Sequence, residues 1–319
     1  MSTSKRYKEI YKDKIQDDFN KEIKVYEHEK DVNTYIPFSH NCGMSCGNNC
    51  AHNCYKKLGV LMRNNLIFYC YGESEIVKKM DEHFFDDFER SVLYAYRNRL
   101  PKRAAKQDGL LSEVLFDLII QNLFPDARKL AVRTILRQDD NNEIKGYDLT
   151  YFINNNGNIQ IWLGQAKLGS KDYCKKGIGE DLETKYELLY MSKQVFFIAD
   201  KQSELSDEGV ALTNTINKVN MINIEKDDKK RAKAFIQYIK DNNIEIVIPC
   251  LLSYEKNSVY KNLEDVEIEI KKEIESIKKY FEGKKYVFEG FSPQLLYFAF
   301  PLEDIDGLRG EEGFYEGLR

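Results

Sequence analysis

The sequence predicts an α/β protein with a mixed central sheet flanked by helices. Three observations predict this fold: an apolar helix precedes several strand-like runs, an Asn-rich turn joins two of those runs, and later helical segments alternate with short apolar runs. At 319 residues the chain is long enough for one large domain with smaller regions attached. We expect an N-terminal region with a Cys-rich segment over residues 1–75, a central domain with a C-terminal α/β extension over 76–305, and a flexible tail over 306–319.

The composition is typical of a globular protein, with 42% hydrophobic and 31% charged residues and a net charge of −4. That charge argues against a protein that coats nucleic acid through bulk positive charge, although a local basic surface remains open. The chain has no apolar run of about 18 residues, the length that predicts a membrane span, and no apolar segment typical of a secretion signal at its N-terminus. Seven cysteines without an export signal favour reduced thiols. We therefore expect a cytoplasmic protein with no membrane partner.

The N-terminal third predicts helices around a small amount of strand. Residues 1–35 suggest a charged peripheral helix and a short strand at 23–26, which we interpret as a solvated arm. An apolar run over 58–71 predicts a buried strand or a short helix, and 76–96 predicts an amphipathic helix. A basic cluster follows over 97–106; it is either a solvated charge run or a contact for phosphate backbone.

Four cysteines recur every four residues in the Cys-rich segment, at Cys42, Cys46, Cys50 and Cys54, with His40 and His52 alongside. Thiolates and imidazoles are the usual ligands of a structural Zn²⁺. Such sites ordinarily separate two ligand pairs by a long gap, and this run has none. A structural zinc site and a tightly packed segment of small buried residues both fit the pattern.

An apolar helix over 109–124 opens the central domain, and Pro125 ends it. Glu113 lies off the apolar stripe of this helix, with Asp117 one turn further along the same side. An acid in such a helix ordinarily only improves solubility. Its relation to the strands that follow is what makes Glu113 a candidate site residue.

Three strands are expected over residues 131–137, 146–153 and 159–168, the last two joined by the turn at 154–157. Alternation along a strand places Gln165 and Lys167 on the same face. Asp148 is then expected within a rung or two of Gln165 across the hairpin. Glu113, Asp148, Gln165 and Lys167 would thereby gather at one edge of the sheet.

The remaining chain predicts a further alternation of helices and strands. We expect helices over 178–191, 206–222, 229–241 and 263–281, and strands over 194–199, 245–254 and 295–301. The apolar segment at 194–199 is interpreted as the fourth strand of the central sheet.

The gathered side chains suit metal-dependent phosphodiester hydrolysis. Mg²⁺ prefers oxygen ligands, commonly one or two carboxylates completed by water and substrate phosphate, so Glu113 and Asp148 are candidate ligands. Gln165 offers a neutral amide oxygen, which is a weaker ligand. Lys167 can orient or deprotonate the attacking water, or meet the developing negative charge. Mn²⁺ is an alternative to Mg²⁺.

These residues resemble the PD-(D/E)xK nuclease superfamily, in which a helix acid, a strand acid and an E-x-K or Q-x-K strand form the metal site. Glu113 matches the helix acid, Asp148 in Gly-Tyr-Asp the strand acid, and Gln165-Ala-Lys167 the Q-x-K variant. More specifically, the chain is similar to the nuclease subunit of the Hachiman anti-phage defence system. The segments that carry this likeness are 111–115, 145–148, 161–167 and 248–254.

The resemblance covers residues 85 to 305 and leaves out the Cys-rich segment. It implies a restriction-endonuclease-like core and a DNA nuclease that works with, and is restrained by, a separate superfamily-two helicase subunit. The sequence contains no G-x-x-x-x-G-K-[ST] phosphate loop, so an ATP-driven step would have to come from such a partner. Gln165 departs from the more common Glu, and the loss of one negative charge is expected to weaken metal binding.

Two other readings of the same residues remain. In the first, the chain is a catalytically silent subunit that binds DNA or the helicase, and Gln165 marks the lost chemistry. In the second, the domain is purely structural, and Lys167 merely pairs with Asp148 and Glu113.

Overall fold

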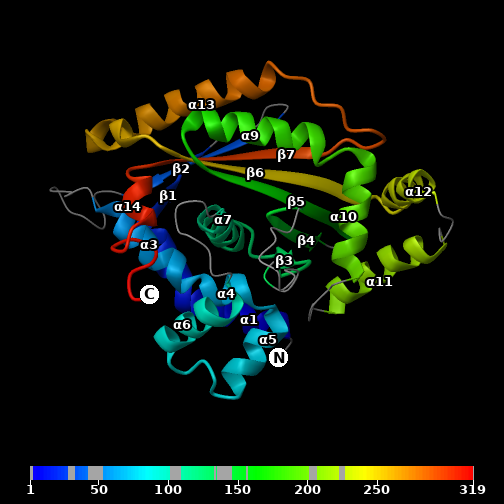
Figure 1. The fold of residues 1–319 in the computed structure, drawn as a ribbon, viewed down its shortest axis with the longest axis horizontal. Helices are drawn as coiled ribbons and strands as arrows, with labels where there is room; N and C mark the ends of the chain where they lie inside the picture. The colour runs from blue at the N-terminus through cyan, green and yellow to red at the C-terminus, as the bar shows by residue number, and fades with distance from the viewer. Residues whose placement is uncertain are drawn as a thin grey trace.

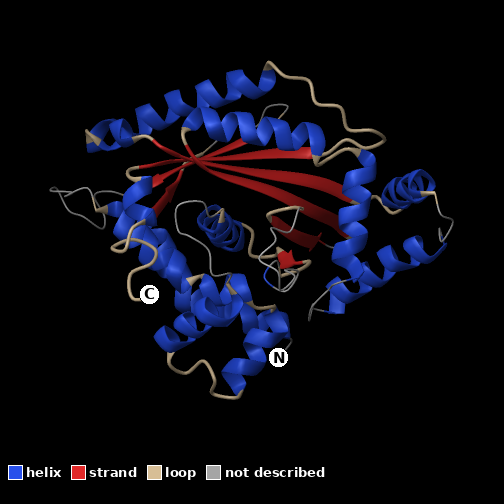
Figure 2. Ribbon diagram, viewed as in Figure 1, coloured by secondary structure: helices blue, strands red, loops and turns tan. Residues whose placement is uncertain are grey.

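A seven-stranded mixed sheet crosses the molecule, with helices on both of its faces (Figure 1 and Figure 2). The structure is a computed structural model, and it describes residues 3–27, 33–41, 53–100, 109–132, 134, 146–155, 157–200, 207–222 and 227–318. The α/β class with a mixed central sheet is therefore confirmed. Within these ranges no helix is both long and apolar enough to cross a membrane.

The sheet has a parallel centre and antiparallel ends. Its strands are β1 (Ile23–Val25), β2 (Thr34–His40), β3 (Arg128–Lys129), β4 (Leu149–Asn155), β5 (Asn158–Gly169), β6 (Glu245–Glu255) and β7 (Gln294–Leu302). They lie in the order β1-β2-β7-β6-β5-β4-β3. Strands β2, β7, β6 and β5 are mutually parallel, whereas β1 pairs antiparallel with β2, and β3, β4 and β5 form an antiparallel meander. The central strands read as continuous apolar runs because helices cover both of their faces.

The helix α7 (Leu110–Leu123) lies against one face of the sheet and beneath a layer of N-terminal helices (Figure 1). That layer contains α1 (Thr3–Tyr11), the π-helix η1 (Lys12–Gln16), α2 (Asp17–Glu22), α3 (Cys54–Asn64), α4 (Leu66–Cys70), α5 (Glu73–Asp81) and α6 (Phe88–Arg99). Every residue of α7 from Leu110 to Gln121 is buried, because the helix is covered on both sides. Gly164 of β5 permits the close approach, since a Cβ there would lie 2.8 Å from the ring of Phe116.

Helix α9 (Lys171–Thr184) covers β5 and β6 on the opposite face, and the long helix α13 (Val266–Glu282) lies beside it (Figure 1). Three further helices, α10 (Leu188–Asp200), α11 (Asp207–Ile222) and α12 (Asp228–Asp241), pack together at one end of the molecule. Short 3-10 turns, η3 (Asn257–Tyr260) and η4 (Leu263–Asp265), precede α13. The sheet therefore separates two apolar cores, one on the α7 side and one on the α9 side.

The strand predicted over 194–199 is wrong, because these residues lie within helix α10. Buried residues recur along α10 at helical spacing, at Leu188, Met191, Val195 and Ile198. A short apolar run fits a buried helix as well as a strand. The fourth strand beside the meander is instead β6, which pairs parallel with β5. The strand predicted over 131–137 lies mostly outside the described residues, and β3 ends before it at Lys129.

The N-terminal segment is part of the core rather than the solvated arm that we expected. Tyr7, Tyr11, Ile15 and Phe19 are all buried, and the ring of Tyr11 meets that of Phe68 edge-on at 4.8 Å. The single helix predicted over 76–96 is also two helices, α5 and α6, separated by a turn. The apolar run at 58–71 is helical, which was one of its two interpretations.

The C-terminal segment, predicted as a flexible tail, packs against α3. After the short helix α14 (Ile305–Arg309), Phe314 and Leu318 are buried. Gly59 of α3 allows close backbone contact, because a Cβ there would lie 2.7 Å from the carbonyl carbon of Gly313. Arg63 also donates a hydrogen bond to the Gly313 carbonyl at 3.3 Å.

Candidate active site

Asp148 lies directly before β4 and opposite Gln165 of β5. Leu149 pairs with Gly164, and the backbone N–H of Asp148 donates to the Gly164 carbonyl at 2.9 Å. The Asp148 carboxylate turns back onto β5, where its Oδ2 accepts from the backbone N–H of Ala166 at 2.8 Å. The hairpin thus places Asp148 beside the Q-x-K segment, as its register predicts.

Gln165 and Lys167 point to the α9 face of the sheet. Ala166, between them, belongs to the core on the α7 side, whereas Leu163 belongs to the core on the α9 side. Gln165 is fully buried, and its amide oxygen accepts from the Lys185 ammonium at 2.6 Å. The oxygen that was expected to face a metal ion therefore already binds a cation.

Lys167 ends in an ion pair with Asp181 of α9. Its Nζ lies 2.5 Å from Asp181 Oδ2, and the other oxygen, Oδ1, lies 3.1 Å from Lys185 Nζ. Burial lowers the pKa of Lys167, but the negative charges of Asp148 and Asp181 outweigh burial and raise that pKa above its ordinary value. Lys167 is therefore protonated at neutral pH, so it suits charge stabilisation better than proton abstraction.

Glu113 lies on α7, on the other face of the sheet from Gln165 and Lys167. Its side chain is buried and accepts a hydrogen bond from the Tyr69 hydroxyl. The structure thus brings Asp148, Gln165 and Lys167 together, and Glu113 lies on the helix that packs against the other face of the sheet. The assignment of Glu113 as a metal ligand stays a prediction.

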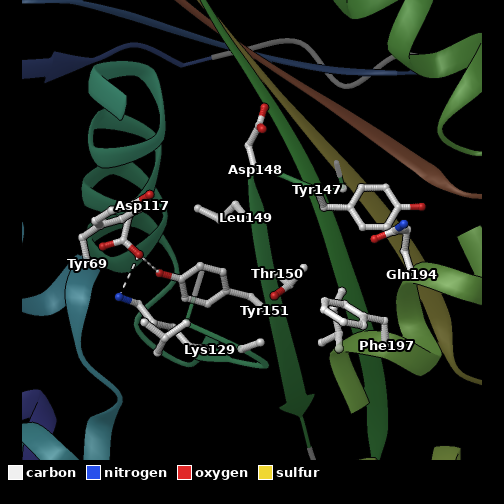
Figure 3. Close-up of a pocket in the computed structure, with 14 residues that line it drawn as sticks. Tyr69, Asp117, Lys129, Tyr147, Asp148, Leu149, Thr150, Tyr151, Gln194 and Phe197 are labelled. Carbon is white, nitrogen blue, oxygen red and sulfur yellow. Dashed lines mark hydrogen bonds and ion pairs between the residues drawn. The ribbon is translucent and has the colours of Figure 1, made fainter. Parts of the chain in front are cut away.

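Asp117, one turn beyond Glu113, is surrounded by donors. Its carboxylate accepts from the Tyr151 hydroxyl at 2.5 Å, from the amides of Asn65 at 3.0 Å and Gln121 at 2.6 Å, and lies 2.9 Å from Lys129 Nζ. Figure 3 shows the last of these contacts together with that of Tyr151. A carboxylate with four close donors has little capacity left for a metal ion.

A small cavity of about 30 Å³ runs along β4 between these groups. Its lining includes Tyr69, Asp117, Asp148 and Gln194, and the Asp148 carboxylate points away from Asp117 (Figure 3). The volume suits one or two water molecules and excludes a nucleotide.

Asp181 and Lys185 were missed by the reading of the sequence. Their spacing of four residues is a signal for one helix face, and both point at β5. The sequence alone does not show which strand that face meets. Among the described residues, no three His, Cys, Asp or Glu side chains form a group that could hold a metal ion.

The Cys-rich segment is described only at its ends. Cys42, Cys46, Cys50 and His52 lie outside the described residues. Cys54 is buried at the start of α3, and its backbone N–H donates to Glu303 Oε2 at 3.0 Å. His40 Nε2 accepts from the Glu303 backbone N–H at 3.2 Å, and burial lowers the pKa of His40 to about 3, so its ring is neutral. The zinc site stays a prediction.

The basic cluster that follows α6 is described only in part. Arg99 pairs with Glu75 at 2.7 Å, whereas Lys102, Arg103 and Lys106 lie outside the described residues. The phosphate-contact interpretation therefore also stays a prediction.

Comparison with known proteins places the chain in a family. A search of the curated proteins finds no match. The model of the HamA family, in contrast, matches residues 9–318, which is nearly the whole chain. The chain therefore belongs to the HamA family and is a component of the Hachiman anti-phage defence system.

Proposed function

We propose that the chain is the metal-dependent DNA nuclease subunit of its defence system. The observation that carries the proposal is the meeting of Asp148 with the Gln165–Lys167 strand across one hairpin. An acid, a protonated lysine and a buried amide are thereby held beside one another. These groups match, residue by residue, the strand acid and Q-x-K segment of the PD-(D/E)xK superfamily.

The topology supports the same proposal. The elements α7, β3, β4, β5, α9 and β6 follow one another as helix, three strands, helix and strand, with α10, α11 and α12 between α9 and β6; β3, β4 and β5 form an antiparallel meander, and β6 is parallel to β5. That order is the one expected for a restriction-endonuclease-like core. It brings the start of β4 and the end of β5 to one side of the sheet, where Asp148 lies.

The donor set fits a hard divalent cation. Asp148 offers one carboxylate, and Asp181 offers another on the same face of the sheet as Lys167. Mg²⁺ commonly takes only one or two carboxylates from a protein. The bound ion would activate water and neutralise charge at the phosphorus. Lys167, protonated and anchored, would meet the negative charge that develops on the phosphate oxygens.

The proposed partners are DNA and a superfamily-two helicase subunit. The HamA family belongs to a multi-component system, and this sequence carries no phosphate-binding loop of the Walker type. ATP-driven unwinding and restraint of the nuclease would therefore belong to the partner.

A second candidate function is a catalytically silent subunit that binds DNA or the helicase. The contact that favours it is the hydrogen bond from Lys185 to the amide oxygen of Gln165, which occupies a ligand position with an ammonium group. Under this alternative the fold is retained for binding alone.

The test is DNA cleavage by the chain together with its helicase, with Mg²⁺ present or chelated and with or without ATP. Asp148→Ala and Lys167→Ala should each lower the cleavage rate by about 100-fold or more. Lys176→Ala is the matched control, because Lys176 lies on α9 with 77% of its side chain exposed. Cleavage that persists in both site variants overturns the nuclease proposal. Absence of cleavage with retained DNA binding supports the silent subunit.

A further inference from the structure

A stripe of α9 lies along the Q-x-K segment and contacts both of its polar residues. Gly177 and Asp181 of α9 and its C-cap residue Lys185 are spaced four residues apart, so they lie along one face of the helix. Gly177 meets the stem of Lys167, Asp181 meets its ammonium group, and Lys185 meets Gln165. The helix and the strand therefore form one polar unit.

Gly177 shows how closely the helix fits Lys167. A Cβ at this position would lie 3.0 Å from Cε and 3.3 Å from Cδ of Lys167. A glycine inside a helix is less favourable than an alanine. Its presence at this contact leaves room for Lys167 to cross the helix and reach Asp181.

Asp181 is the acid that both lysines of this polar unit contact. Each of its oxygens faces a different ammonium group, Lys167 at 2.5 Å and Lys185 at 3.1 Å, and 13% of its side chain is exposed. Lys185 bridges onward from Asp181 to the Gln165 amide oxygen. Asp181 is thus connected to both residues of the Q-x-K segment.

The charges explain why such an acid is needed. An E-x-K strand carries one negative and one positive side chain, whereas Gln165 and Lys167 together carry only the positive one. We propose that Asp181 supplies, from helix α9, the carboxylate that position 165 lacks, and that it is the second acid ligand of the divalent cation beside Asp148. This inference rests on the proposed metal-dependent function.

The electrostatics of neighbouring groups agree with this placement. Burial raises the pKa of the Cys250 thiol, and Asp181 and Asp148 both raise it further. Burial likewise raises the pKa of Tyr186, with smaller contributions from both acids. Asp148 and Asp181 therefore both lie close enough to Cys250 and Tyr186 to affect the ionisation of these two groups.

The decisive experiment measures Mn²⁺ affinity of the purified chain by electron paramagnetic resonance, without DNA or turnover. Asp181→Asn should weaken Mn²⁺ binding by about tenfold or more. The double variant Gln165→Glu/Asp181→Asn should restore the affinity to within about threefold of wild type, because the carboxylate returns to the same face. Lys185, already 2.6 Å from position 165, would pair with the new acid.

Asp172→Asn is the matched control. Asp172 lies on the same helix and pairs with Lys175 at 2.8 Å, but 92% of its side chain is exposed. Its loss should leave Mn²⁺ affinity unchanged. Unchanged affinity in Asp181→Asn, a loss that Gln165→Glu does not restore, or a wild-type chain that binds no Mn²⁺ each overturns the inference.

Two further comparisons keep the test decisive. If Asp181→Asn does not fold, Asp181→Glu keeps the negative charge beside Lys167 and Lys185 but moves the carboxylate by one methylene, and it should still weaken Mn²⁺ binding several-fold; unchanged affinity in this folded variant would overturn the inference. The DNA cleavage assay separates this inference from the proposed function. Cleavage that needs Asp148 and Lys167 but not Asp181 overturns only the inference, whereas Mn²⁺ binding through Asp181 without any cleavage overturns only the nuclease.

Discussion

The two faces of the sheet carry similar polar side chains in different surroundings. Each face has a polar cluster that combines an acid with lysine and amide groups. We define the α7 cluster as Glu113, Asp117, Gln121, Lys129 and Tyr151. We define the α9 cluster as Gln165, Lys167, Asp181 and Lys185. In the α7 cluster the side chains of Asp117 and Lys129 are 3% and 6% exposed. In the α9 cluster those of Asp181, Lys167 and Lys185 are 13%, 19% and 24% exposed.

The donors around the two acids also differ. Asp117 receives hydrogen bonds from three neutral side chains besides Lys129, so its charge is balanced without any ligand. Asp181 instead faces two ammonium groups, those of Lys167 and Lys185, at its two oxygens. A buried acid–lysine pair is therefore not by itself a sign of function. The two clusters differ in the exposure of their charged side chains and in the donors that surround the acid.

The largest expected effect is on stability in the α7 cluster. Asp117→Ala would leave Lys129 buried without its carboxylate and remove the acceptor of three other donors, which should lower the free energy of unfolding by about 3–5 kcal/mol. Urea denaturation measures the change. Asp126→Ala is the control, because Asp126 pairs with Lys8 at the surface, where such pairs contribute about 0–1 kcal/mol. Equal losses of unfolding free energy in the two variants would show that Asp117 contributes no more to stability than a surface ion pair.

The second prediction concerns the pH dependence of stability, which we expect to depend on Glu73. This residue lies on the same side of the sheet, with its Oε2 3.7 Å from Nε of Arg128. Burial raises the pKa of Glu73 to about 7, although Arg128 and Lys129 act against it. Because the folded pKa exceeds the unfolded one, the contribution of Glu73 to stability is full below about pH 4.5 and is lost as pH rises through 7. The total change is about 3 kcal/mol.

Glu73→Gln should remove this dependence. Urea denaturation at pH 4.5, 6 and 8 should give nearly equal stabilities for the variant and wild type at the lowest pH, and a variant more stable by up to about 3 kcal/mol at the highest. A constant difference across the three values would show that Glu73 does not titrate in this range.

The third prediction compares acids from the two faces by their effect on cleavage. Asp148→Asn should lower the rate of the proposed Mg²⁺-dependent DNA cleavage by about 100-fold, because the carboxylate proposed to bind the cation is lost. Glu113→Gln should lower it by about tenfold, less than Asp148→Asn, because a glutamine keeps one side-chain oxygen both as a weaker ligand and as the acceptor for the Tyr69 hydroxyl. A loss in Glu113→Gln as large as that in Asp148→Asn would show that the two faces act as one site.

The sequence was informative wherever a local pattern determines the structure. Alternation and the turn at 154–157 predicted the β4–β5 hairpin, so Asp148, Gln165 and Lys167 were found correctly as neighbours. Continuous apolar runs predicted β6 and β7. These features depend on residues that are close along the chain.

The sequence was misleading where packing between distant segments decides the structure. The segment at 194–199 has the same apolar character in a buried helix as in a strand, and only its contacts with α11 and α12 distinguish the two. The charges of α1 suggested exposure, although its tyrosines pack on Phe68 of α4. Asp181 is 14 residues beyond Lys167, and only the docking of α9 on β5 brings the two together.

The smallest expected change tests whether the α9 face is shaped for activity rather than for stability. Gly177→Ala should raise the free energy of unfolding by up to about 1 kcal/mol through helix propensity, because the Lys167 stem is flexible enough to move by a few tenths of an ångström. The same shift would pull the Lys167 ammonium away from Asp181, and cleavage should fall several-fold. Gly179→Ala is the matched control, since a Cβ there would meet Lys284 and Tyr286 instead. Both alanines should stabilise α9 alike, but only the one beside Lys167 should slow cleavage; equal rates in the two variants would mean that the position of Lys167 over α9 does not matter for the reaction.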